Sequence, residues 1–346
     1  MYRGAMSKVT IKTLAELFQV TPKTVSKVLN HKPGVGEELR QSILRKAEEL
    51  NYVPNVFGRG LQGNTMKTIG VVISDNASPN YSSIVKAIEA AADRAGYNMI
   101  LCNSSENIEI EEKKIKLLIE KQVEGIIIAP VHREEAGEVH PLLKRLADLA
   151  IHYVLISRSP RDGGSHTVVR TDDEQGGYAA ARYLIDCGHR RIAVLVHELP
   201  ITPSTERLKG YRRAFAEAGV LWDERCIVTF PDATVECGKR AMLQALDHNE
   251  DCTAVLAFND IIAMGAMIAA RERGRRIPDD LAIVGFDDIT YAQAMNPPLT
   301  TVRQDTALIG SRAFEVLHHK MTGLVKPTGQ GKLILLQPEL IIRETV

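Results

Sequence analysis

Short, almost purely apolar runs alternate with amphipathic stretches over most of this 346-residue chain, and this alternation restricts the fold more than any other feature. The runs GIIIAP at 125–130 and AVLAF at 254–258 carry no polar side chain. Such runs are typical of strands that are buried on both faces of a parallel sheet. The pattern therefore predicts an α/β core of two doubly wound parallel-sheet subdomains over residues 67–346.

The expected elements of this core follow from the period of the apolar residues. Strands are expected at 68–73, 98–102, 125–129, 151–156, 192–196, 227–230, 254–257 and 281–285. Helices are expected at 82–95, 109–121, 140–149, 175–187, 209–218, 234–247 and 261–273. The N-subdomain is expected to cover about 67–169 and 303–332, and the C-subdomain about 170–302 and 333–346.

The first 66 residues have a helical pattern and a different charge. They hold ten basic and five acidic residues, so their net charge is +5, against −5 for the rest of the chain. Thr10 precedes apolar residues at helical spacing, and Thr21 followed by Pro22 is typical of a helix N-terminus. A third helix is expected from about Glu37 to Leu50. The pattern fits either a helix-turn-helix or a small helical bundle with a solvated face.

Longer strings favour the helix-turn-helix. VTIKTLAELFQVTPKTVSKVLN from residue 9 and LRQSILRKAEELNYVPN from residue 39 resemble the DNA-binding headpiece of LacI/GalR-family transcriptional regulators. ERLKGYRRAFAEAG from residue 206 and LAIVGFDDITYAQAMNPPLTTVRQD from residue 281 resemble the family's periplasmic-binding-protein-like core. The resemblance implies an all-α headpiece at 9–53, a hinge helix within 54–66 and an effector-binding and dimerisation core at 67–346. Residues 1–8 are expected to be a disordered leader.

The resemblance also implies which residues contact DNA. Pro22, Lys23 and Lys27 take positions that face base edges in the family. Lysine can donate to guanine N7 and O6 but lacks the planar fork of arginine, so we expect a guanine preference with looser geometry. Contacts that fix register rather than read sequence are expected from Thr21, Thr24, Ser26, Asn30 and Tyr52, and Asn55 is also expected at the DNA.

DNA binding also depends on three residues of the hinge and on one residue of the headpiece turn. Leu61 takes the place of the hinge leucine that relatives wedge into the minor groove, although a flexible linker is the alternative for this segment. Gly58 and Gly60 disfavour a helix there, so the hinge helix is expected only when DNA and a dimer partner hold it. Gln19 stands at a turn position where many relatives carry glycine.

Polar residues that follow strands are candidates for a ligand site, because open parallel sheets bind ligands beyond the carboxyl ends of their strands. This criterion selects five pairs of residues: Ser74 and Asp75, Asn80 and Tyr81, Ser157 and Arg158, Asn259 and Asp260, and Asp287 and Asp288. The resemblance implies effector contacts from two of these residues, Asn259 and Asp287, and adds Arg207 and Gln304.

The residue types at these positions indicate the chemistry of the effector. Carboxylate, amide and guanidinium groups form paired hydrogen bonds with adjacent hydroxyls, which favours a sugar-like effector. Ser157 replaces the aspartate that relatives often place before Arg158, which argues against an unmodified neutral hexose. Because Ala233 stands where some relatives carry an aromatic ring, Phe230 or Tyr81 is expected to supply the apolar platform.

The function implied is that of a ligand-responsive bacterial transcriptional regulator, expected to be a repressor. It would bind a pseudo-palindromic double-stranded DNA operator as a homodimer, because one headpiece reads only a half-site. The alternative is a corepressor-dependent regulator that senses a nucleobase, a nucleoside or a phosphorylated metabolite. The sign of the effector response stays open.

The rival classes are an enzyme and a solute-binding protein for transport. The sequence has no GxGxxG at the start of a βα unit, no phosphate-binding loop, no nucleophile elbow and no HExxH, so no enzyme is expected. Five cysteines without CxxC spacing predict neither a disulfide framework nor a metal, and no cofactor is expected. No apolar run is long enough to cross a membrane and no export signal is present, which predicts a cytoplasmic location.

Overall fold

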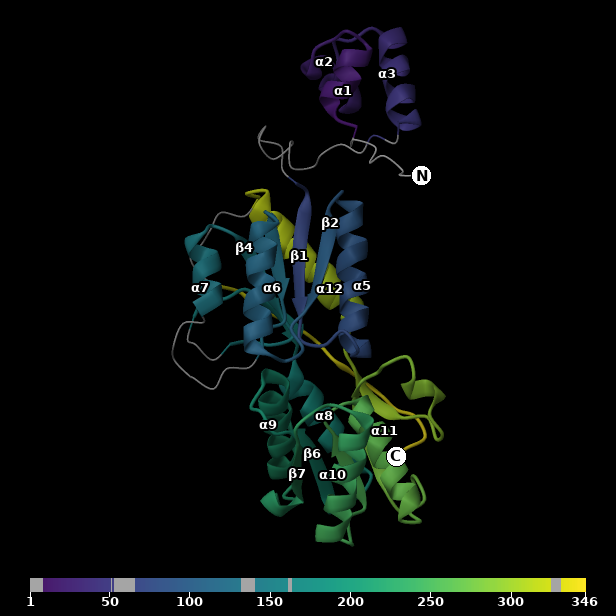
Figure 1. Ribbon diagram of the computed structural model, residues 1–346. Coiled ribbons are helices and arrows are strands. Elements are labelled where there is room, and N and C mark those ends of the chain that lie inside the picture. The colour runs from purple at the N-terminus through teal and green to yellow at the C-terminus, as the bar shows by residue number, and fades with distance from the viewer. Residues whose placement is uncertain (1–8, 51, 53–65, 132–140, 161–163, 325–330) are drawn as a thin grey trace. The chain divides into compact units, whose positions relative to one another are not determined.

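The computed structural model describes residues 9–50, 52, 66–131, 141–160, 164–324 and 331–346 (Figure 1). The chain divides into two compact units, Met1–Met66 and Lys67–Val346. The division falls where the sequence changes from the basic helical pattern to alternating strands and helices. Among the helices of the described ranges, none combines the length and the apolar character that a membrane span requires.

The first unit contains three helices, α1 (Ile11–Leu17), α2 (Pro22–Leu29) and α3 (Glu37–Glu49). The hydroxyl of Thr10 accepts from the Thr13 amide, and the hydroxyl of Thr21 accepts from the Thr24 amide, so threonines cap α1 and α2. Gln19, in the turn between these helices, has a φ of 51°, in the left-handed region where glycine is favoured. This backbone explains why relatives carry glycine at the position. The buried core of the unit is formed by Leu14, Ala15, Val25, Val28, Ile43 and Ala47.

The second unit contains two six-stranded sheets. The first has the order β11-β5-β4-β3-β1-β2 and is parallel throughout. Its strands are β1 (Thr68–Ile73), β2 (Asn98–Asn103), β3 (Gly125–Ile128), β4 (His152–Ile156), β5 (Val168–Thr171) and β11 (Leu333–Leu336). Helices α5 (Pro79–Arg94) and α12 (Thr306–Met321) pack on one face, and α6 (Ile108–Glu120) and α7 (Pro141–Asp148) pack on the other.

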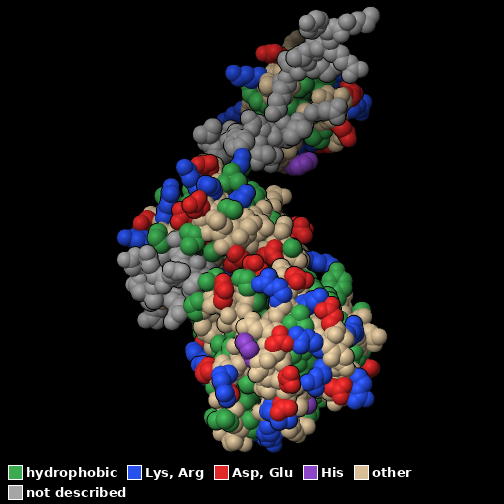
Figure 2. Space-filling view, turned by 60° about the horizontal axis from the view of Figure 1, so that its bottom comes forward, with side chains coloured by type: hydrophobic (Ala, Val, Ile, Leu, Met, Phe, Trp, Pro, Cys, Tyr) green, Lys and Arg blue, Asp and Glu red, His purple; other side chains and the backbone are tan. Residues whose placement is uncertain are grey.

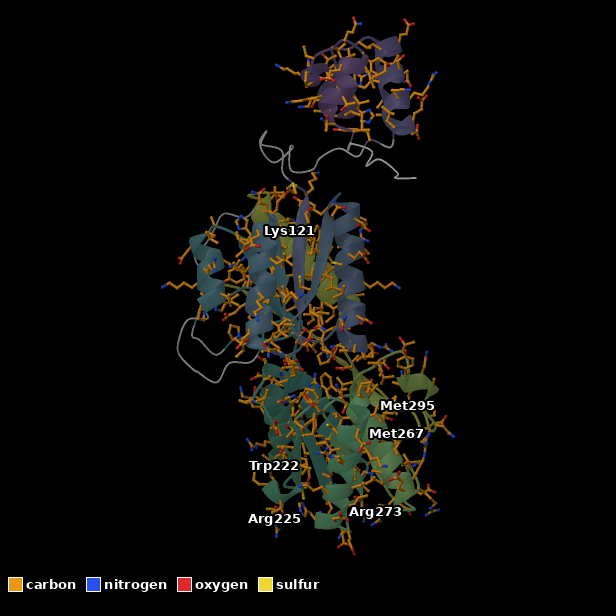
Figure 3. The ribbon with its side chains drawn as sticks, viewed as in Figure 1. Lys121, Trp222, Arg225, Met267, Arg273 and Met295 are labelled. Carbon is orange, nitrogen blue, oxygen red and sulfur yellow. The ribbon has the colours of Figure 1, made fainter. Side chains whose placement is uncertain are left out.

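The second sheet has the order β12-β10-β9-β8-β6-β7, in which only β12 is antiparallel to its neighbour. Its strands are β6 (Ile192–His197), β7 (Ile227–Phe230), β8 (Ala254–Ala257), β9 (Ala282–Asp287), β10 (Thr300–Arg303) and β12 (Glu339–Ile341). One face is covered by α8 (Asp173–Asp186) and α9 (Thr202–Glu217), and the other by α10 (Val235–His248) and α11 (Asp260–Glu272). Met267 of α11 and the neighbouring Met295 pack into the core on the latter face (Figure 3).

The predicted α/β core of two doubly wound sheets is confirmed, but several elements differ from the expectation. β5, β10 and α12 were not expected as separate elements, and β5 and β10 are short strands with polar residues. α9 begins at Thr202 rather than near residue 209, because its first two turns carry polar side chains, such as buried Ser204 and Arg207, that hide the apolar period.

The subdomain boundary near residue 333 was also placed too early. Leu333–Leu336 pairs in register with Val168–Thr171 and so completes the first sheet rather than the second. The chain therefore passes between subdomains after β5, after β10 and after β11, in three short connections. These connections lie where the two sheets approach each other (Figure 1).

Candidate functional site

A cavity of about 640 Å³ lies between the two subdomains of the core, within the usual size range of small-molecule sites. Residues of both subdomains line it. All eight residues predicted to bind effector are among them: Asn80, Tyr81, Ser157, Arg158, Arg207, Asn259, Asp287 and Gln304. The structure thus brings together side chains that are up to 224 positions apart in the sequence (304 − 80).

On the C-subdomain side, Arg207 is held from several directions. Its Nε donates to Asp173 Oδ1 at 2.9 Å, and its Nη1 donates to the carbonyl oxygen of Phe258. Its guanidinium carbon lies 3.5 Å from the ring centroid of Phe286 and 4.8 Å from that of Phe258, at cation–π distance. Only 4% of Arg207 is exposed, so its guanidinium has a single fixed orientation at the cavity wall.

Asp287 ends β9 with a φ of 113°, a backbone conformation that is strained for a residue other than glycine. Its Oδ1 accepts from Gln304 Nε2 at 2.6 Å and lies 3.9 Å from Arg207 Nη2. Gln304 Oε1 in turn accepts from the Thr171 hydroxyl at 2.6 Å. Thr171 ends β5 and Gln304 follows β10, so these bonds join two of the connections between the subdomains.

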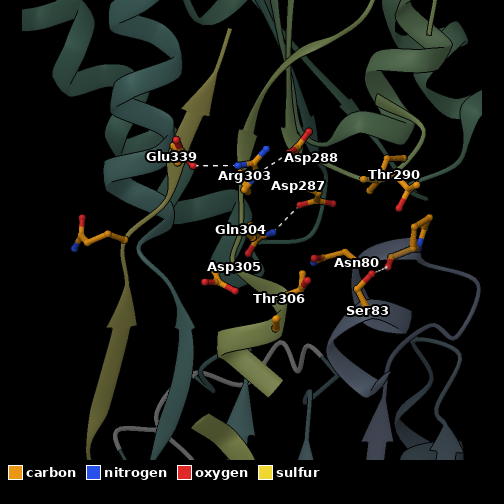
Figure 4. Close-up of a pocket in the computed structure, with 14 residues that line it drawn as sticks. Asn80, Ser83, Asp287, Asp288, Thr290, Arg303, Gln304, Asp305, Thr306 and Glu339 are labelled. Carbon is orange, nitrogen blue, oxygen red and sulfur yellow. Dashed lines mark hydrogen bonds and ion pairs between the residues drawn. The ribbon is translucent and has the colours of Figure 1, made fainter. Parts of the chain in front are cut away.

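Burial raises the pKa of Asp287 to about 6, although Arg207 and the Gln304 amide oppose the shift. The Asp287–Gln304 pair also borders a second cavity of about 510 Å³ (Figure 4). That cavity is lined by residues of the connections and of the first turn of α5, including Asn80. The pair therefore forms part of the wall that separates the two cavities.

Asp260, a candidate by its place after β8, has a structural role. It is fully buried, and its carboxylate accepts from the Thr301 hydroxyl at 2.5 Å and from the Ile289 amide at 2.8 Å. Burial, with the nearby charge of Asp287, raises the pKa of Asp260 well above its usual value. Asn259 lines the cavity but also caps α11, because its Oδ1 accepts from the Ile262 amide at 2.9 Å. Its side-chain amide group keeps its donors for a ligand.

On the N-subdomain side, Arg158 forms a two-bond ion pair with Glu106. Arg158 Nη1 donates to Glu106 Oε2 at 2.8 Å, and Nη2 donates to Oε1 at 2.6 Å. Burial alone would raise the pKa of Glu106, but its bonds with Arg158 lower it. Glu106 was missed by the sequence reasoning, although it follows β2 and so met the criterion used for the other candidates.

Asn80 and Tyr81 lie in the first turn of α5, which Ser78 caps. Burial raises the pKa of Tyr81, so its hydroxyl is neutral and can donate. Asn80 Oδ1 and Ser157 Oγ are buried without a hydrogen-bond partner among the described residues. Buried polar atoms of this kind are costly unless a ligand or water satisfies them.

Of the two residues expected to supply the apolar platform, one lines the cavity. Tyr81 lines the cavity as predicted, but Phe230 does not. Phe258 lines it instead, with Phe230 packed behind at 5.9 Å between ring centroids. Phe258 follows β8 directly and was not considered, because only polar residues after strands were selected.

The headpiece places its predicted DNA contacts on α2 and around it. Pro22 and Lys23 are exposed and Lys27 is partly exposed, whereas Val25 and Val28 of the same helix face the core. The remaining polar residues of α2 also stabilise the helix itself. The Thr21 and Thr24 hydroxyls are 3.0 Å apart, and Asn30 Nδ2 donates to the Ser26 carbonyl at 2.9 Å.

The other predicted contacts lie after α3. Tyr52 packs against the headpiece core and is partly exposed. Asn55 and Leu61 lie outside the described residues. The described geometry thus presents a basic helix surface, and the contacts themselves remain predictions.

Comparisons with known proteins place both units in one family. Residues 10–55 match the profile of bacterial regulatory proteins of the lacI family, and residues 181–346 match a periplasmic binding protein-like domain. The transcriptional repressor PurR of Vibrio atlanticus is 35% identical over 340 residues, which cover 97% of this chain and 98% of PurR. The transcriptional regulator DegA of Bacillus subtilis is 34% identical and covers 98% of each chain.

Solved structures give the same result. The lac repressor dimer bound to operator and the anti-inducer ONPF matches with a TM-score of 0.85 at 27% identity, over 98% of this chain and 99% of that chain. The complex of the transcriptional regulator CelR with cellobiose matches with a TM-score of 0.73 at 32% identity, over 98% and 100% of the two chains. The family resemblance of the headpiece and core strings is confirmed: the chain belongs to the lacI family of bacterial regulatory proteins.

Proposed function

We propose that this protein is a transcriptional repressor that binds a pseudo-palindromic operator as a homodimer and responds to a sugar-like metabolite in the cavity of the core. One observation carries the proposal. The buried Arg207–Asp173 pair and the Asp287–Gln304 pair present fixed donors and acceptors to a cavity between two subdomains. Such a set forms paired bonds with adjacent hydroxyls and penalises a ligand that lacks one of them.

The relatives support each part of this proposal. The lac repressor structure is described as a dimer bound to operator and an anti-inducer, and the CelR structure is a complex with cellobiose. A helix-turn-helix reads a half-site, so two headpieces in fixed register provide the affinity that specific binding needs. Operator binding also places the protein in the bacterial cytoplasm, and we propose that it binds its effector without catalysing a reaction.

The proposed coupling is a linkage between the cavity and the headpieces. The hydrogen bonds Thr171–Gln304–Asp287 run along the connections between subdomains, so a ligand that engages Asp287 favours one relative orientation of the two sheets. In a dimer, that orientation would set the separation of the hinges and so the affinity for the operator. The effector would act by differential binding to two orientations.

The test is affinity selection of genomic fragments on the purified full-length protein at about 150 mM salt, where non-specific phosphate binding is weak. We expect recovery of a two-fold symmetric site of about 14–20 base pairs, because two headpieces span half-sites about one helical turn or more apart. Cellobiose and other sugars are then tested for release of the fragment.

Each other outcome has a definite meaning. If the DNA site is recovered only after a metabolite extract is added, the effector is a corepressor and not an inducer, which is the alternative form of this regulator. Failure to recover any symmetric site from folded protein, with or without the extract, would refute the operator-binding proposal.

A further inference from the structure

We propose that Glu106 makes the cavity selective against anionic ligands, because it keeps the Arg158 guanidinium in a two-bond ion pair. The ion pair would exclude sugar phosphates and other phosphorylated or carboxylated metabolites from the cavity, and uncharged polyols would bind instead. The inference rests on the proposed function only in taking the cavity as the effector site. The specificity residue, Glu106, belongs to neither the strand-end candidates nor the residues implied by the family resemblance.

The first step is the geometry of the pair. Both guanidinium nitrogens of Arg158 donate to separate oxygens of Glu106, at 2.8 and 2.6 Å, which is the fork-to-fork arrangement of a strong ion pair. The Arg158 side chain is 10% exposed and that of Glu106 is 40% exposed, so the guanidinium is largely shielded from solvent while its carboxylate partner remains accessible; both residues line the cavity. Although burial opposes the charged form, Tyr81 and Glu106 raise the pKa of Arg158, and the guanidinium stays charged.

The second step is the backbone that holds Glu106 there. Ser105 and Glu106 have φ values of 52° and 53°, two consecutive left-handed residues that are not glycine. Such backbone is unfavourable for residues other than glycine, and it persists only where surrounding contacts enforce it. The contacts are present: the Glu106 amide donates to the Ser74 carbonyl at 3.0 Å, and the Ser105 amide donates to Asn103 Oδ1 at 3.1 Å.

The rest of the cavity offers no unpaired cation within the part of the chain that the structure describes. Arg207, the other guanidinium of the described lining, is already paired with Asp173. Burial and the charge of Arg158 lower the pKa of His197, so this side chain adds no cation at neutral pH. Asp75, Glu198 and Asp232 add three carboxylates that have no ion pair within the described part of the chain. Figure 2 shows acidic side chains gathered where the two subdomains meet.

These steps have a direct consequence for specificity. Among the described lining residues, an anionic ligand finds no cation that lacks a carboxylate partner, and it must displace Glu106 while facing several like charges. A hydroxyl group can donate to Glu106 or accept from Arg158 without breaking the pair. The pair therefore discriminates by charge, while the hydrogen bonds of the C-subdomain side recognise the hydroxyls.

The experiment measures the binding of inorganic phosphate to the full-length protein by isothermal titration calorimetry, for the wild type, Glu106→Gln and Glu198→Gln. Glu106→Gln keeps the shape and one acceptor but removes the charge that neutralises Arg158. Glu198→Gln is the matched control, because it removes one carboxylate from the same lining without releasing a guanidinium. We expect phosphate to bind Glu106→Gln at least about tenfold more tightly than it binds the wild type or Glu198→Gln.

A double variant, Glu106→Gln with Arg158→Gln, identifies the group that binds. It should lose the gained phosphate affinity, because the guanidinium is the proposed anchor. Thermal unfolding of each variant verifies that it is folded before titration. If Glu106→Gln does not fold, Glu106→Asp serves instead: its shorter side chain cannot span both guanidinium bonds, and it should show a smaller gain in the same direction.

Three results would overturn the inference: equal phosphate affinity in wild type and Glu106→Gln, an equal gain in Glu198→Gln, or a gain that persists in the double variant. None of these results depends on DNA. If the genomic selection fails while the phosphate result holds, the operator-binding proposal is wrong and the charge selectivity of the cavity stands. If the selection succeeds and phosphate binding is unchanged, only the role of Glu106 is wrong.

Discussion

The two walls of the core cavity each hold an arginine–carboxylate pair, yet the pairs differ in burial. On the C-subdomain wall, the Arg207 and Asp173 side chains are 4% and 3% exposed. On the N-subdomain wall, the Arg158 and Glu106 side chains are 10% and 40% exposed. A fully buried pair cannot lose one partner without leaving a charge away from water, whereas water can replace a half-exposed partner. The C-subdomain wall is therefore a fixed template and the N-subdomain wall an adjustable one.

The two walls are also built differently. Arg207 and Asp173 belong to α9 and α8, which approach closely because Gly177 and Gly210 have no side chains: a Cβ on Gly177 would lie 2.5 Å from the Arg207 carbonyl oxygen. Glu106 lies in a short loop between β2 and α6 with left-handed backbone. A helix pair resists displacement over its whole length, whereas the loop backbone at Ser105 and Glu106 is held by its hydrogen bonds to Asn103 and Ser74, which are few compared with the contacts between two helices.

The largest expected effect is the loss of the buried carboxylate. Asp173→Ala should destabilise the core by about 3–5 kcal/mol, because it leaves Arg207 and Arg170 without their shared buried partner. Thermal and urea unfolding of the full-length protein measure this loss. Asp173→Asn, which retains one acceptor for Arg207, should lose less. A loss no larger than that of Glu106→Ala would contradict the distinction between the walls.

The next largest effect is the pH dependence of stability that Asp287, on the C-subdomain wall, produces. The pKa of Asp287 is about 6 in the folded protein, against an ordinary aspartate value of 3.8, so the folded state binds this proton more tightly than the unfolded state. The stabilising contribution is fully present below pH 4 and is lost as the pH rises through 6, by up to about 3 kcal/mol. Asp287→Asn should gain stability relative to wild type over this range. Parallel unfolding profiles of the two proteins from pH 4 to 8 would argue against a raised pKa.

A smaller effect is expected from the helix contact behind the fixed wall. A side chain on Gly210 would collide with the backbone of Glu174 and Tyr178 on α8, so Gly210→Ala should separate α8 from α9. We expect a destabilisation of about 1–3 kcal/mol, typical of overpacking. Lys209→Ala, an exposed change on the same helix, is the control and should alter stability little. Similar unfolding midpoints for the two variants would show that the helices accommodate the methyl group.

The smallest effect belongs to the adjustable wall. Glu106→Ala should destabilise the core by about 1 kcal/mol or less, because water reaches the position of the carboxylate and can solvate Arg158. The unfolding midpoint in urea measures the change. A loss of several kcal/mol would mean that the pair is effectively buried, and the two walls would then be equivalent.

Local sequence signals predicted much of this molecule. Thr10 and Thr21 marked the starts of α1 and α2 because a cap depends on residues within one turn. Apolar runs predicted most strands of the core, since a strand buried on both faces needs nothing but apolar residues. The strand-end criterion together with the family resemblance found eight residues of one cavity, because topology brings the carboxyl ends of parallel strands together.

Two missed strands, β5 and β10, and the missed first turns of α9 share a different property. β5 and β10 contain buried polar residues with partners that are distant in the sequence. Arg170 pairs with Glu206, the Thr300 hydroxyl accepts from the Arg343 amide, and the Thr301 hydroxyl donates to Asp260. The early turns of α9 are polar because they face the cavity and carry Arg207. In each case a tertiary contact supplies the partner of a buried polar residue. The spacing of apolar residues along the chain does not predict such a contact.

The sequence by itself determined the family, the helical headpiece, the alternation of strands and helices, and the residue types that meet at the cavity, because each depends on neighbours along the chain or on shared strings. Only the tertiary structure decided that Leu333–Leu336 completes the first sheet, that Phe258 rather than Phe230 lines the cavity, and that Glu106 neutralises Arg158 across 52 positions. Pairing between distant segments depends on how the whole chain packs, since many carboxylates could reach an arginine and only the assembled fold selects one.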